Sequence, residues 1–514
     1  MDVNNTNQLK YTVFISGAAV MVIEILGGRI IAPYYGSSTY VWSALISVIL
    51  ASLALGYYVG GQLADISPSV RRLSLILLVS ALMVFLIPFV KQQVFLMSLP
   101  MGVYLGSIFA PLILLSLPGI FLGMVSPYTV KIAAKHLENL GTIAGDLYAL
   151  STVGSIAGTF ATGFILIPNF RISSIFFGIA LVLALTSSYL YVKNTSSIKL
   201  GRQTVFSILL ISLILVSLAT YTTSYPVDKK LLHVEYTPYN QIMVLEDENN
   251  RYLSLDGSAE GAIRFDTNYS LYEYANYFEI PFLMRSEIKD VLVAGEGAGV
   301  GPRQIKANHP GTHVTVSEIN PRVHEIAKEY FMVDDSEIDV RRVGIRSFIQ
   351  STNETYDYVI LDAYNGFFTI PFHILTLEFF HGIKGILNPD GIVLMNIITP
   401  PEGSKSHLFR CVLKTVAEEF KYIRIYPTEG DDTSVQNVIL IASNTPLGDE
   451  QSLYDKANDT VVLSKAYITH MLDKQLLTPI DYSDGILLTD DYSPVNYLYM
   501  PLLGEHQRPI FVHD

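Results

Sequence analysis

Long apolar stretches fill the first half of the chain, and shorter apolar runs separated by polar segments fill the second half. A helix needs about 20 largely apolar residues to cross a bilayer, because the hydrocarbon core is about 30 Å thick and the helix rises about 1.5 Å per residue. Seven stretches are long and apolar enough, approximately 11–33, 40–64, 73–90, 103–125, 147–168, 172–192 and 205–225. We therefore expect a multipass α-helical membrane bundle of about seven spans within residues 1–228.

The pattern changes after residue 228. Residues 229–265 alternate between apolar and polar positions, which predicts a small β-hairpin region. From residue 289 onward, short apolar runs alternate with segments of helical spacing: "DVLVAG", "HVTVSEI", "IDVRRVG", "YDYVILD" and "GIVLMNI". This alternation predicts an α/β domain over residues 266–514 with a Rossmann-like, doubly wound parallel sheet that binds ligands outside the carboxyl ends of its strands.

Charge separates the same two halves. Residues 1–228 contain eleven Lys and Arg against six Asp and Glu, and the whole chain carries a net charge of −13, which leaves −18 for residues 229–514. Such acidity disfavours nucleic acid as a partner and suits a cationic ligand. With one cysteine, and with His373 and His381 outside any compact cluster of ligands, no metal site is expected.

The first β-to-α turn of the predicted sheet is rich in glycine, with Gly295, Gly297 and Gly299 around Glu296. A dinucleotide fingerprint needs a further glycine where this chain has Val300, so the pyrophosphate pattern fails. The form G-x-G-x-G resembles motif I of S-adenosylmethionine-type methyltransferase folds. About 20 residues on, the second strand ends at Glu318, where an acid can accept hydrogen bonds from ribose hydroxyls. A mere tight turn with a solvated glutamate is the simpler interpretation.

The fourth predicted strand ends at Asp362, which places a carboxylate at the ligand edge of the sheet. There it can hold or deprotonate an amine nucleophile, although a strand-end aspartate can also simply cap the next segment. Aromatic residues are frequent near these segments and suit adenine stacking, a sulfonium cage or ordinary core packing. They are Tyr269, Tyr272, Tyr274, Tyr364, Phe367 and Phe368.

Several motifs together resemble one family, the spermidine synthases, in the form that carries a transmembrane bundle before the catalytic domain. In the tail they are "YNQIMV", "LSLDG", "YEYANY", "VLVAGEGAG", "VSEINPRV", "YDYVILDAYN", "IPFHILTLEFF" and "LLTDDYSPVNYL"; in the bundle, "LYALSTVGSIAGTFATGFILIP" fits the fifth span. The resemblance implies transfer of an aminopropyl group from decarboxylated S-adenosylmethionine to an amine, with release of methylthioadenosine. It assigns Gln241 to the thionucleoside, Glu318 to its ribose and Asp362 to general base catalysis.

Four positions depart from the pattern of the soluble enzymes. Where those enzymes have an acid that grips the amine of the donor, this chain has Ala298, with Glu296 two residues away as a substitute. The other departures are Tyr272 beside Glu273 in the polyamine-facing segment, Ile345 and Arg346 in place of the adenine-binding acid, and Asn365 in place of a second aspartate. Desolvated ammonium groups need anionic or aromatic partners, so these losses weaken the expected grip on a diamine.

The departures leave two alternatives open. Intact S-adenosylmethionine fits if Arg346 or another cation lies near its carboxylate, which would make the protein a methyltransferase, an aminocarboxypropyltransferase or a lyase acting at the membrane. The second alternative is a transporter or sensor, in which the helical bundle carries the function and the nucleoside-binding domain is inactive. If the protein is an enzyme, its acceptor substrate is expected to be a small amine or a membrane-associated molecule. A homo-oligomer is compatible with the resemblance, although the β-rich region through which soluble relatives associate is shortened here.

Loop charges and cosubstrate chemistry point to opposite sides of the membrane. With seven spans, most of the basic loop residues lie on the side opposite to the tail, and the positive-inside rule would then place the tail outside the cell. A sulfonium nucleoside is a cytoplasmic compound. On that ground we expect a cell-membrane protein with a cytoplasmic catalytic domain.

Overall fold

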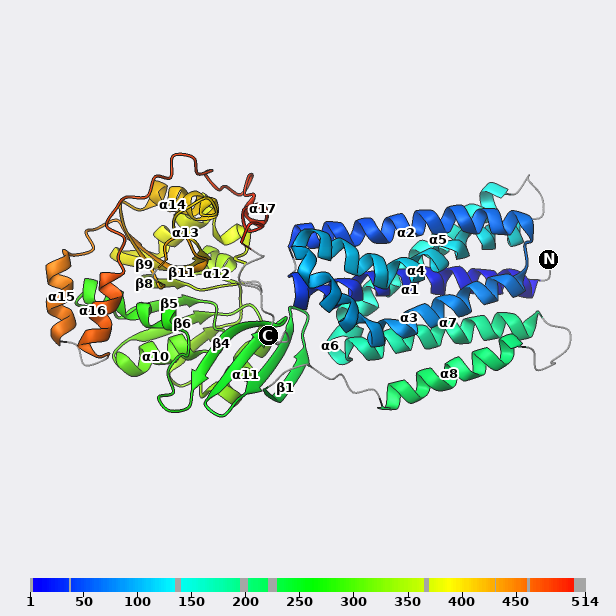
Figure 1. Ribbon diagram of the computed structural model, residues 1–514, viewed down its shortest axis with the longest axis horizontal. Helices are drawn as coiled ribbons and strands as arrows, with labels where there is room; N and C mark the ends of the chain where they lie inside the picture. Colours follow the sequence, from blue (N-terminus) through cyan, green and yellow to red (C-terminus); the bar gives the residue numbers. More distant parts are fainter. Residues whose placement is uncertain are drawn as a thin grey trace. The chain divides into compact units, whose positions relative to one another are not determined.

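The computed structural model describes residues 3–36, 38–134, 140–194, 202–220, 229–364, 369–429, 431–459 and 463–502. Within these residues the chain divides into two compact units. The first consists of residues 1–225 together with 236–238, and the second of residues 226–235 together with 239–514. The first unit is helical and the second contains both sheets (Figure 1).

Seven helices of the described first unit are long and apolar enough to cross a membrane, in agreement with the number expected from the sequence. The fifth of these spans continues through a π-helical turn, η3 (Thr162–Leu166), into the short α6 (Ile167–Asn169). The helices that carry the spans are α1 (Val3–Tyr35), α2 (Thr39–Ile66), α3 (Val70–Ser98), α4 (Gly102–Ala133), α5 (Leu140–Ala161), α7 (Ile172–Lys193) and α8 (Arg202–Thr220).

Glycines allow two pairs of these helices to pack backbone to backbone. A Cβ atom added to Gly154 of α5 would lie 2.1 Å from the carbonyl oxygen of Phe14 in α1, and one added to Gly158 would lie 2.6 Å from that of Ala18. Gly56 of α2 approaches the carbonyl oxygen of Ile120 in α4 in the same way. The four-residue spacing of glycines therefore marks true helix contacts at these positions. Gly163, in the same series, has open space instead.

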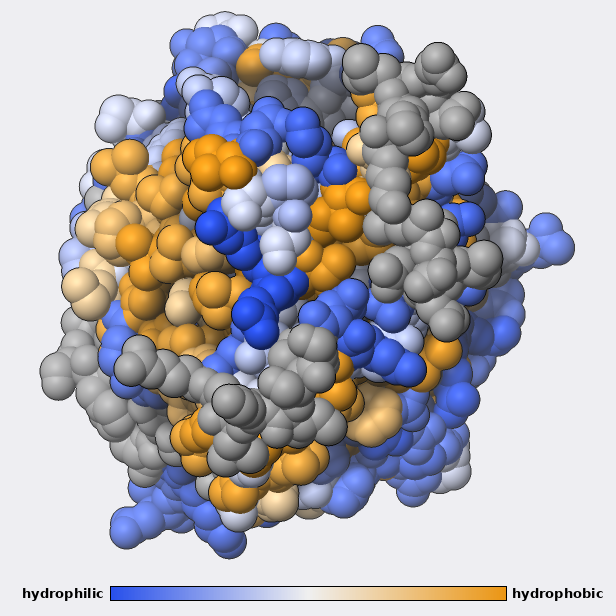
Figure 2. Space-filling model, turned by 90° about the vertical axis from the view of Figure 1, so that its right-hand side faces the viewer, coloured by the Kyte–Doolittle hydropathy of each residue, from blue (hydrophilic) through white to orange (hydrophobic). Residues whose placement is uncertain are grey.

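The surface of the bundle is apolar along its sides. Large side chains such as Leu105 and Phe164 are exposed over 65% and 75% of their surface. Figure 2 views the bundle end-on, with hydrophobic side chains along its flanks and hydrophilic side chains gathered in the middle of the end facing the viewer. A belt of exposed apolar residues is the surface that a helical bundle presents to lipid.

The second unit begins with a four-stranded sheet of order β1-β2-β3-β4. Its strands are β1 (Lys230–Tyr236), β2 (Gln241–Glu246), β3 (Asn250–Leu255) and β4 (Ser258–Arg264), and β3 pairs with β2 and β4 in antiparallel fashion. Asp256 and Gly257 make the tight turn between β3 and β4, both with positive φ. One face packs on the helices α10 (Val300–Asn308) and α11 (Pro321–Phe331) through residues such as Ile263 and Val323.

A seven-stranded sheet of order β10-β11-β9-β8-β5-β6-β7 forms the core of the second unit. The strands are β5 (Asp290–Ala294), β6 (His313–Ser317), β7 (Ile338–Arg341), β8 (Tyr356–Leu361), β9 (Leu387–Thr399), β10 (Tyr422–Pro427) and β11 (Gln436–Ser443). The strands from β7 to β9 are parallel. The strand β11 is antiparallel to both β9 and β10, and these two strands, β10 and β11, lie beyond those predicted from the sequence. The order and directions are those of a methyltransferase-type fold.

Helices cover both faces of this sheet (Figure 1). Alternate residues of β5 point to opposite sides: Leu292 belongs to the core beneath α12 (Ile345–Ser351), α13 (Leu377–Ile386) and α14 (His407–Glu419). Val293 belongs to the other core, with α10, α11, α15 (Glu450–Asp459) and α16 (Lys465–Asp473). Burial on both faces explains why these strands read as continuous apolar runs.

Candidate active site

The carboxyl ends of β5, β6 and β8 meet at one edge of the large sheet. The N–H of Gly295 donates to the carbonyl oxygen of Ser317 at 2.9 Å, and the N–H of Asp362 donates to that of Ala294 at 3.0 Å. These bonds continue the ladders by one residue on each side of β5. The glycine turn, Glu318 and Asp362 consequently share the crevice where a doubly wound sheet binds its ligand.

Glycine is required twice in this turn. Gly295 has a φ of 89°, and a Cβ atom there would lie 2.5 Å from the carbonyl oxygen of Asp362. Gly299 has a φ of 69° and precedes the first residue of α10, and its Cβ would lie 2.3 Å from Val333. The turn therefore brings bare backbone to the crevice, next to the amide end of a helix.

Glu318 is buried and held by two backbone donors. The N–H of Glu296 donates to its Oε2 at 3.0 Å and the N–H of Asn320 donates to its Oε1 at 2.7 Å. Each oxygen keeps a second lone pair, which suits a pair of vicinal hydroxyls. Burial raises the pKa of Glu318 to about 7, against the opposing effect of these hydrogen bonds.

Gln241 lies at the start of β2, on the side of the small sheet that adjoins this edge. Its N–H donates to the carboxylate of Asp256 at 2.8 Å, and the residue as a whole is 6% exposed. The amide of the preceding residue, Asn240, accepts a hydrogen bond of 2.9 Å from Asn320, two residues beyond Glu318. This bond brings the predicted nucleoside contact Gln241 close to the strand end that carries Glu318.

Asp362 is oriented by one hydrogen bond to each carboxylate oxygen. The amide of Asn396 on β9 donates to its Oδ1 at 2.9 Å, and the hydroxyl of Tyr274 donates to its Oδ2 at 3.1 Å. Burial raises the pKa of Asp362, and the two hydrogen bonds oppose that rise. Asn437 on β11 donates to the side-chain oxygen of Asn396 at 3.0 Å, which fixes the orientation of that amide. The result is a desolvated, oriented carboxylate beside the glycine turn.

Comparison with known proteins agrees with this geometry. Residues 276–428 match the spermine/spermidine synthase domain. A polyamine aminopropyltransferase of Shouchella clausii (strain KSM-K16) is 30% identical over 210 residues, which cover 38% of this chain and 72% of that protein. The chain belongs to the spermine/spermidine synthase family. Spermidine synthase family members use decarboxylated S-adenosylmethionine as the donor cosubstrate and an amine as the acceptor.

Two further members of the family show how far the similarity extends. The polyamine aminopropyltransferase of Vibrio vulnificus (strain CMCP6) is 25% identical over 292 residues, covering 52% of this chain and 91% of that protein. Polyamine aminopropyltransferase 2 of Aquifex aeolicus (strain VF5) is 23% identical over 497 residues, covering 92% of this chain and 94% of that protein. An alignment of that length includes most of the helical bundle, in agreement with the membrane-fused form inferred from the sequence.

Two of the residues expected to replace family acids have other partners in the structure. The carboxylate of Glu296 is buried against His324 of α11, whose Nδ1 lies 2.9 Å from its Oε1. The guanidinium of Arg346 forms an ion pair with Asp490 and a hydrogen bond with Thr376. The Glu296 hydrogen bond raises the pKa of His324. The assignment of Glu296 and Arg346 to binding of the aminopropyl donor therefore stays a prediction, because both side chains already have partners within the protein.

The remaining residues predicted to bind donor or acceptor lie in different surroundings. Tyr272 stacks on Tyr274 with ring centroids 6.3 Å apart, and thus lies next to the Asp362 cluster. Glu273 is exposed, and Ile345 packs in the core beneath the sheet. Asn365, Phe367 and Phe368 fall outside the described residues.

Sequence reasoning missed three polar residues of this region. Asn396 and Asn437 lie on neighbouring strands, and Glu260 lies on β4. Asn396 interrupts the apolar run "GIVLM" of a buried strand, which is a detectable signal. Glu260 follows the turn Asp256–Gly257 in a strand that was expected to be a plain hairpin, so only its tertiary neighbours distinguish it.

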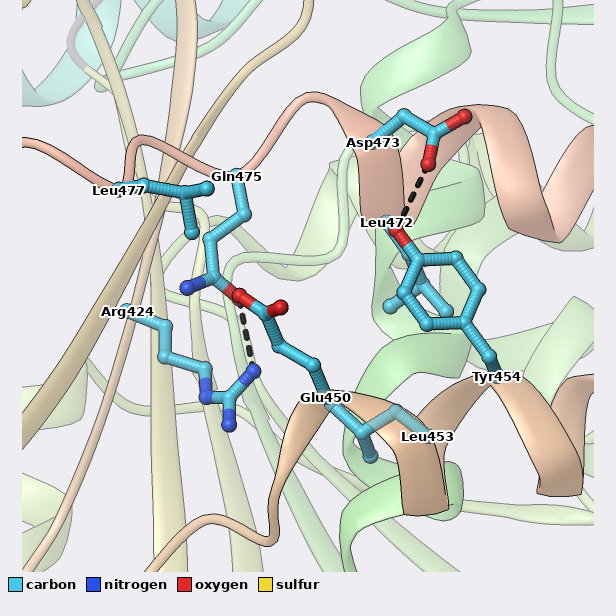
Figure 3. Close-up of a pocket in the computed structure, with 8 residues that line it drawn as sticks. All are labelled: Arg424, Glu450, Leu453, Tyr454, Leu472, Asp473, Gln475 and Leu477. Carbon is cyan, nitrogen blue, oxygen red and sulfur yellow. Dashed lines mark hydrogen bonds between the residues drawn. The ribbon is translucent and has the colours of Figure 1, made fainter.

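A separate pocket of about 200 Å³ lies between β10, α15 and α16 (Figure 3). Four of its polar side chains are paired: Arg424 donates to Gln475 at 2.7 Å and Tyr454 donates to Asp473 at 2.7 Å. Three strands separate β10 from β5, so this pocket is not part of the candidate active site. Across the described ranges, the structure contains no group of three or more His, Cys, Asp or Glu side chains arranged to hold a metal ion.

Proposed function

We propose that this chain transfers the aminopropyl group of decarboxylated S-adenosylmethionine to an acceptor amine and releases methylthioadenosine. The observation that carries the proposal is Asp362, a buried carboxylate oriented by Asn396 and Tyr274 at the strand end beside the glycine turn. Membership of the spermine/spermidine synthase family supports the same chemistry.

The reaction is an in-line displacement at the carbon next to the sulfonium. The acceptor nitrogen forms a new N–C bond, the C–S bond breaks, and sulfur keeps the electron pair as the neutral thioether. Asp362 accepts the proton that the attacking amine loses and stabilises the positive charge that develops on nitrogen. Glu318 and the glycine turn would hold the nucleoside so that the reacting carbon faces the amine.

The charges of the pocket favour the decarboxylated donor over intact S-adenosylmethionine. The cation that was expected to bind a donor carboxylate, Arg346, is neutralised by Asp490. Buried acids, Glu318 and Asp362, line the crevice edge instead, and they would repel a carboxylate. This arrangement weighs against methyl or aminocarboxypropyl transfer.

We further propose that the helical bundle holds the catalytic domain at a membrane, on the cytoplasmic side. Seven apolar helices with lipid-compatible flanks support the first part. The cytoplasmic origin of the sulfonium donor supports the second. A membrane-bound enzyme can receive its amine from the cytoplasm or from the bilayer surface, and the family relationship favours a small-molecule amine.

The decisive experiment measures methylthioadenosine released from decarboxylated S-adenosylmethionine by the full chain in detergent, with putrescine as the amine. Asp362→Asn should reduce turnover by at least about a hundredfold, because it removes the base, while methylthioadenosine binding measured by calorimetry stays within a few-fold. Asp455→Asn, on the surface of α15, is the matched control and should leave both unchanged.

Three outcomes would contradict the proposal or the role it gives to Asp362. Production of S-adenosylhomocysteine from intact S-adenosylmethionine would indicate methyl transfer. Nucleoside binding by the wild-type chain without any turnover would indicate a sensor or transporter with an inactive domain. An equal loss of binding and turnover in Asp362→Asn would assign Asp362 a structural role.

A further inference from the structure

Glu260 has a buried carboxylate oxygen with no partner. Among the described residues, its Oε1 makes no hydrogen bond and is shielded from solvent. Its backbone carbonyl lies 3.1 Å from the position of a Cβ atom on Gly297, so this part of β4 adjoins the glycine turn. A buried carboxyl oxygen without a donor is costly, and a ligand that supplies a donor would remove the cost.

Glu260 and Asp362 share neighbouring residues, notably Tyr274. The segment after β4 folds back on the strand, with the N–H of Leu271 donating to the carbonyl oxygen of Ala262 at 3.1 Å. This pairing brings Tyr272 and Tyr274 beside β4, and Tyr274 donates to Asp362. The pKa of Glu260 is raised to about 7, chiefly by burial; the hydroxyl of Ser258 opposes this rise, and the negative charges of Asp362 and Asp256 contribute to it.

Asp362 and Glu260 both adjoin the glycine turn through their backbones. Asp362 contacts Gly295 through its carbonyl oxygen, and Glu260 contacts Gly297 through its own. The stacked rings of Tyr272 and Tyr274 lie within the same cluster. Two acids and two aromatic rings in a desolvated space form an environment for a ligand with more than one positive charge.

We propose that Glu260 binds the non-reacting ammonium group of the acceptor and so selects acceptors that carry two amino groups. The inference rests on the proposed function, in which Asp362 receives the reacting amine. Glu260 would be an anionic partner for the second ammonium group of the acceptor. The sequence analysis had found no such partner, since Tyr272 and Asn365 stand where the family pattern has other groups. Glu260 is a specificity residue and takes no part in the displacement itself.

The test measures amine binding, so it does not depend on turnover. Putrescine and n-butylamine are titrated into the full chain in detergent, loaded with methylthioadenosine. Glu260→Gln should weaken putrescine binding by at least about tenfold, because a charged hydrogen bond is lost, and should leave n-butylamine and methylthioadenosine within about twofold. Glu260→Asp should keep part of the preference for the diamine. Glu248→Gln, in the exposed turn between β2 and β3, is the matched control and should behave as wild type.

Equal putrescine affinity in Glu260→Gln and wild type would overturn the inference, as would an absence of putrescine binding to the wild-type chain. An equal loss of both amines would assign Glu260 a structural role and would also overturn it. If the diamine preference depends on Glu260 but no methylthioadenosine is formed from the donor, the inference stands and the proposed function fails.

Discussion

At the scale of single residues, the site depends on how two carboxylates are held. Asp362 receives one hydrogen bond on each oxygen, and Glu318 receives one backbone N–H on each oxygen. In both groups a lone pair remains on each oxygen for the ligand. Burial makes these acids weaker, and the donors limit how far the pKa rises. The protonation of each acid is therefore sensitive to single hydrogen bonds.

Asn396→Ala tests this sensitivity. Its N–H stabilises the ionised form of Asp362, so its loss should raise the pKa of that carboxyl further above the ordinary value. The proposed base works as a carboxylate, above its pKa, so the acidic limb of the kcat/KM profile should move to higher pH, with kcat at pH 7 reduced by roughly tenfold. Methylthioadenosine release across pH 6 to 9 measures this shift.

The control for this variant is Asn388→Ala. Asn388 donates to the carboxylate of Asp357 at 2.6 Å, the same pairing between the same two strands at the opposite end of the sheet. It should leave the pH profile in place even if it lowers stability. A profile that shifts equally in both variants would show that Asn396 acts only through folding.

At the scale of elements, backbone contact between α1 and α5 organises part of the bundle. Gly154 and Gly158 face carbonyl groups of α1, and Gly17 of α1 faces Ser151 of α5. Gly145, about two and a half turns before Gly154 on α5, has open space around it. The same residue type on one helix is therefore required at one position and replaceable at another.

Gly154→Ala should destabilise the bundle, because its Cβ would lie 2.1 Å from the carbonyl oxygen of Phe14 and the two backbones would have to separate. A loss of about 1–3 kcal/mol is expected from overpacking. The single tryptophan of the chain, Trp42, lies in α2, so its fluorescence reports on the bundle alone during thermal unfolding in detergent.

Gly145→Ala provides the comparison on the same helix. It adds a methyl group where nothing lies within 4 Å and replaces glycine by a better helix former, so its midpoint should equal or exceed that of the wild type. Identical midpoints for the two variants would show that the close contact between α1 and α5 does not contribute to stability.

At the scale of the whole molecule, one chain combines a helical unit whose exposed surface is apolar with an α/β unit of ordinary globular construction. The first has apolar helices with a surplus of basic residues, and the second is an acidic α/β unit with its own hydrophobic cores. An odd number of spans, such as the seven candidates, would place the amino terminus and the catalytic domain on opposite sides of a membrane. Loop charges and the origin of the donor disagree about which side each occupies.

We expect the catalytic domain in the cytoplasm. Protease added to inverted membrane vesicles should digest the tail, whereas protease added to intact cells should leave it whole. A tag on the amino terminus serves as the internal control and should show the reverse pattern. Digestion of the tail in intact cells would contradict the expectation and favour the orientation given by the loop charges.

The sequence by itself determined the elements whose signal is local. Hydropathy predicted seven membrane-length helices, and alternation predicted the strands from β5 to β9 because each buries both faces. Glycine spacing and strand ends predicted that Gly295, Glu318 and Asp362 would share one edge, since parallel strands present their carboxyl ends together. The strands β10 and β11 were not predicted. Their antiparallel direction could not have been predicted either, because strand direction does not appear in a hydropathy pattern.

Only the tertiary structure decided which polar groups meet. Arg346 pairs with Asp490 from a segment 144 residues away, and Asn396 reaches Asp362 from a neighbouring strand. Glu260 adjoins the glycine turn because the small sheet folds against it, a contact that no spacing in the sequence encodes. Hydrogen bonds and charges act over a few ångströms in space, and packing, not order along the chain, sets those distances.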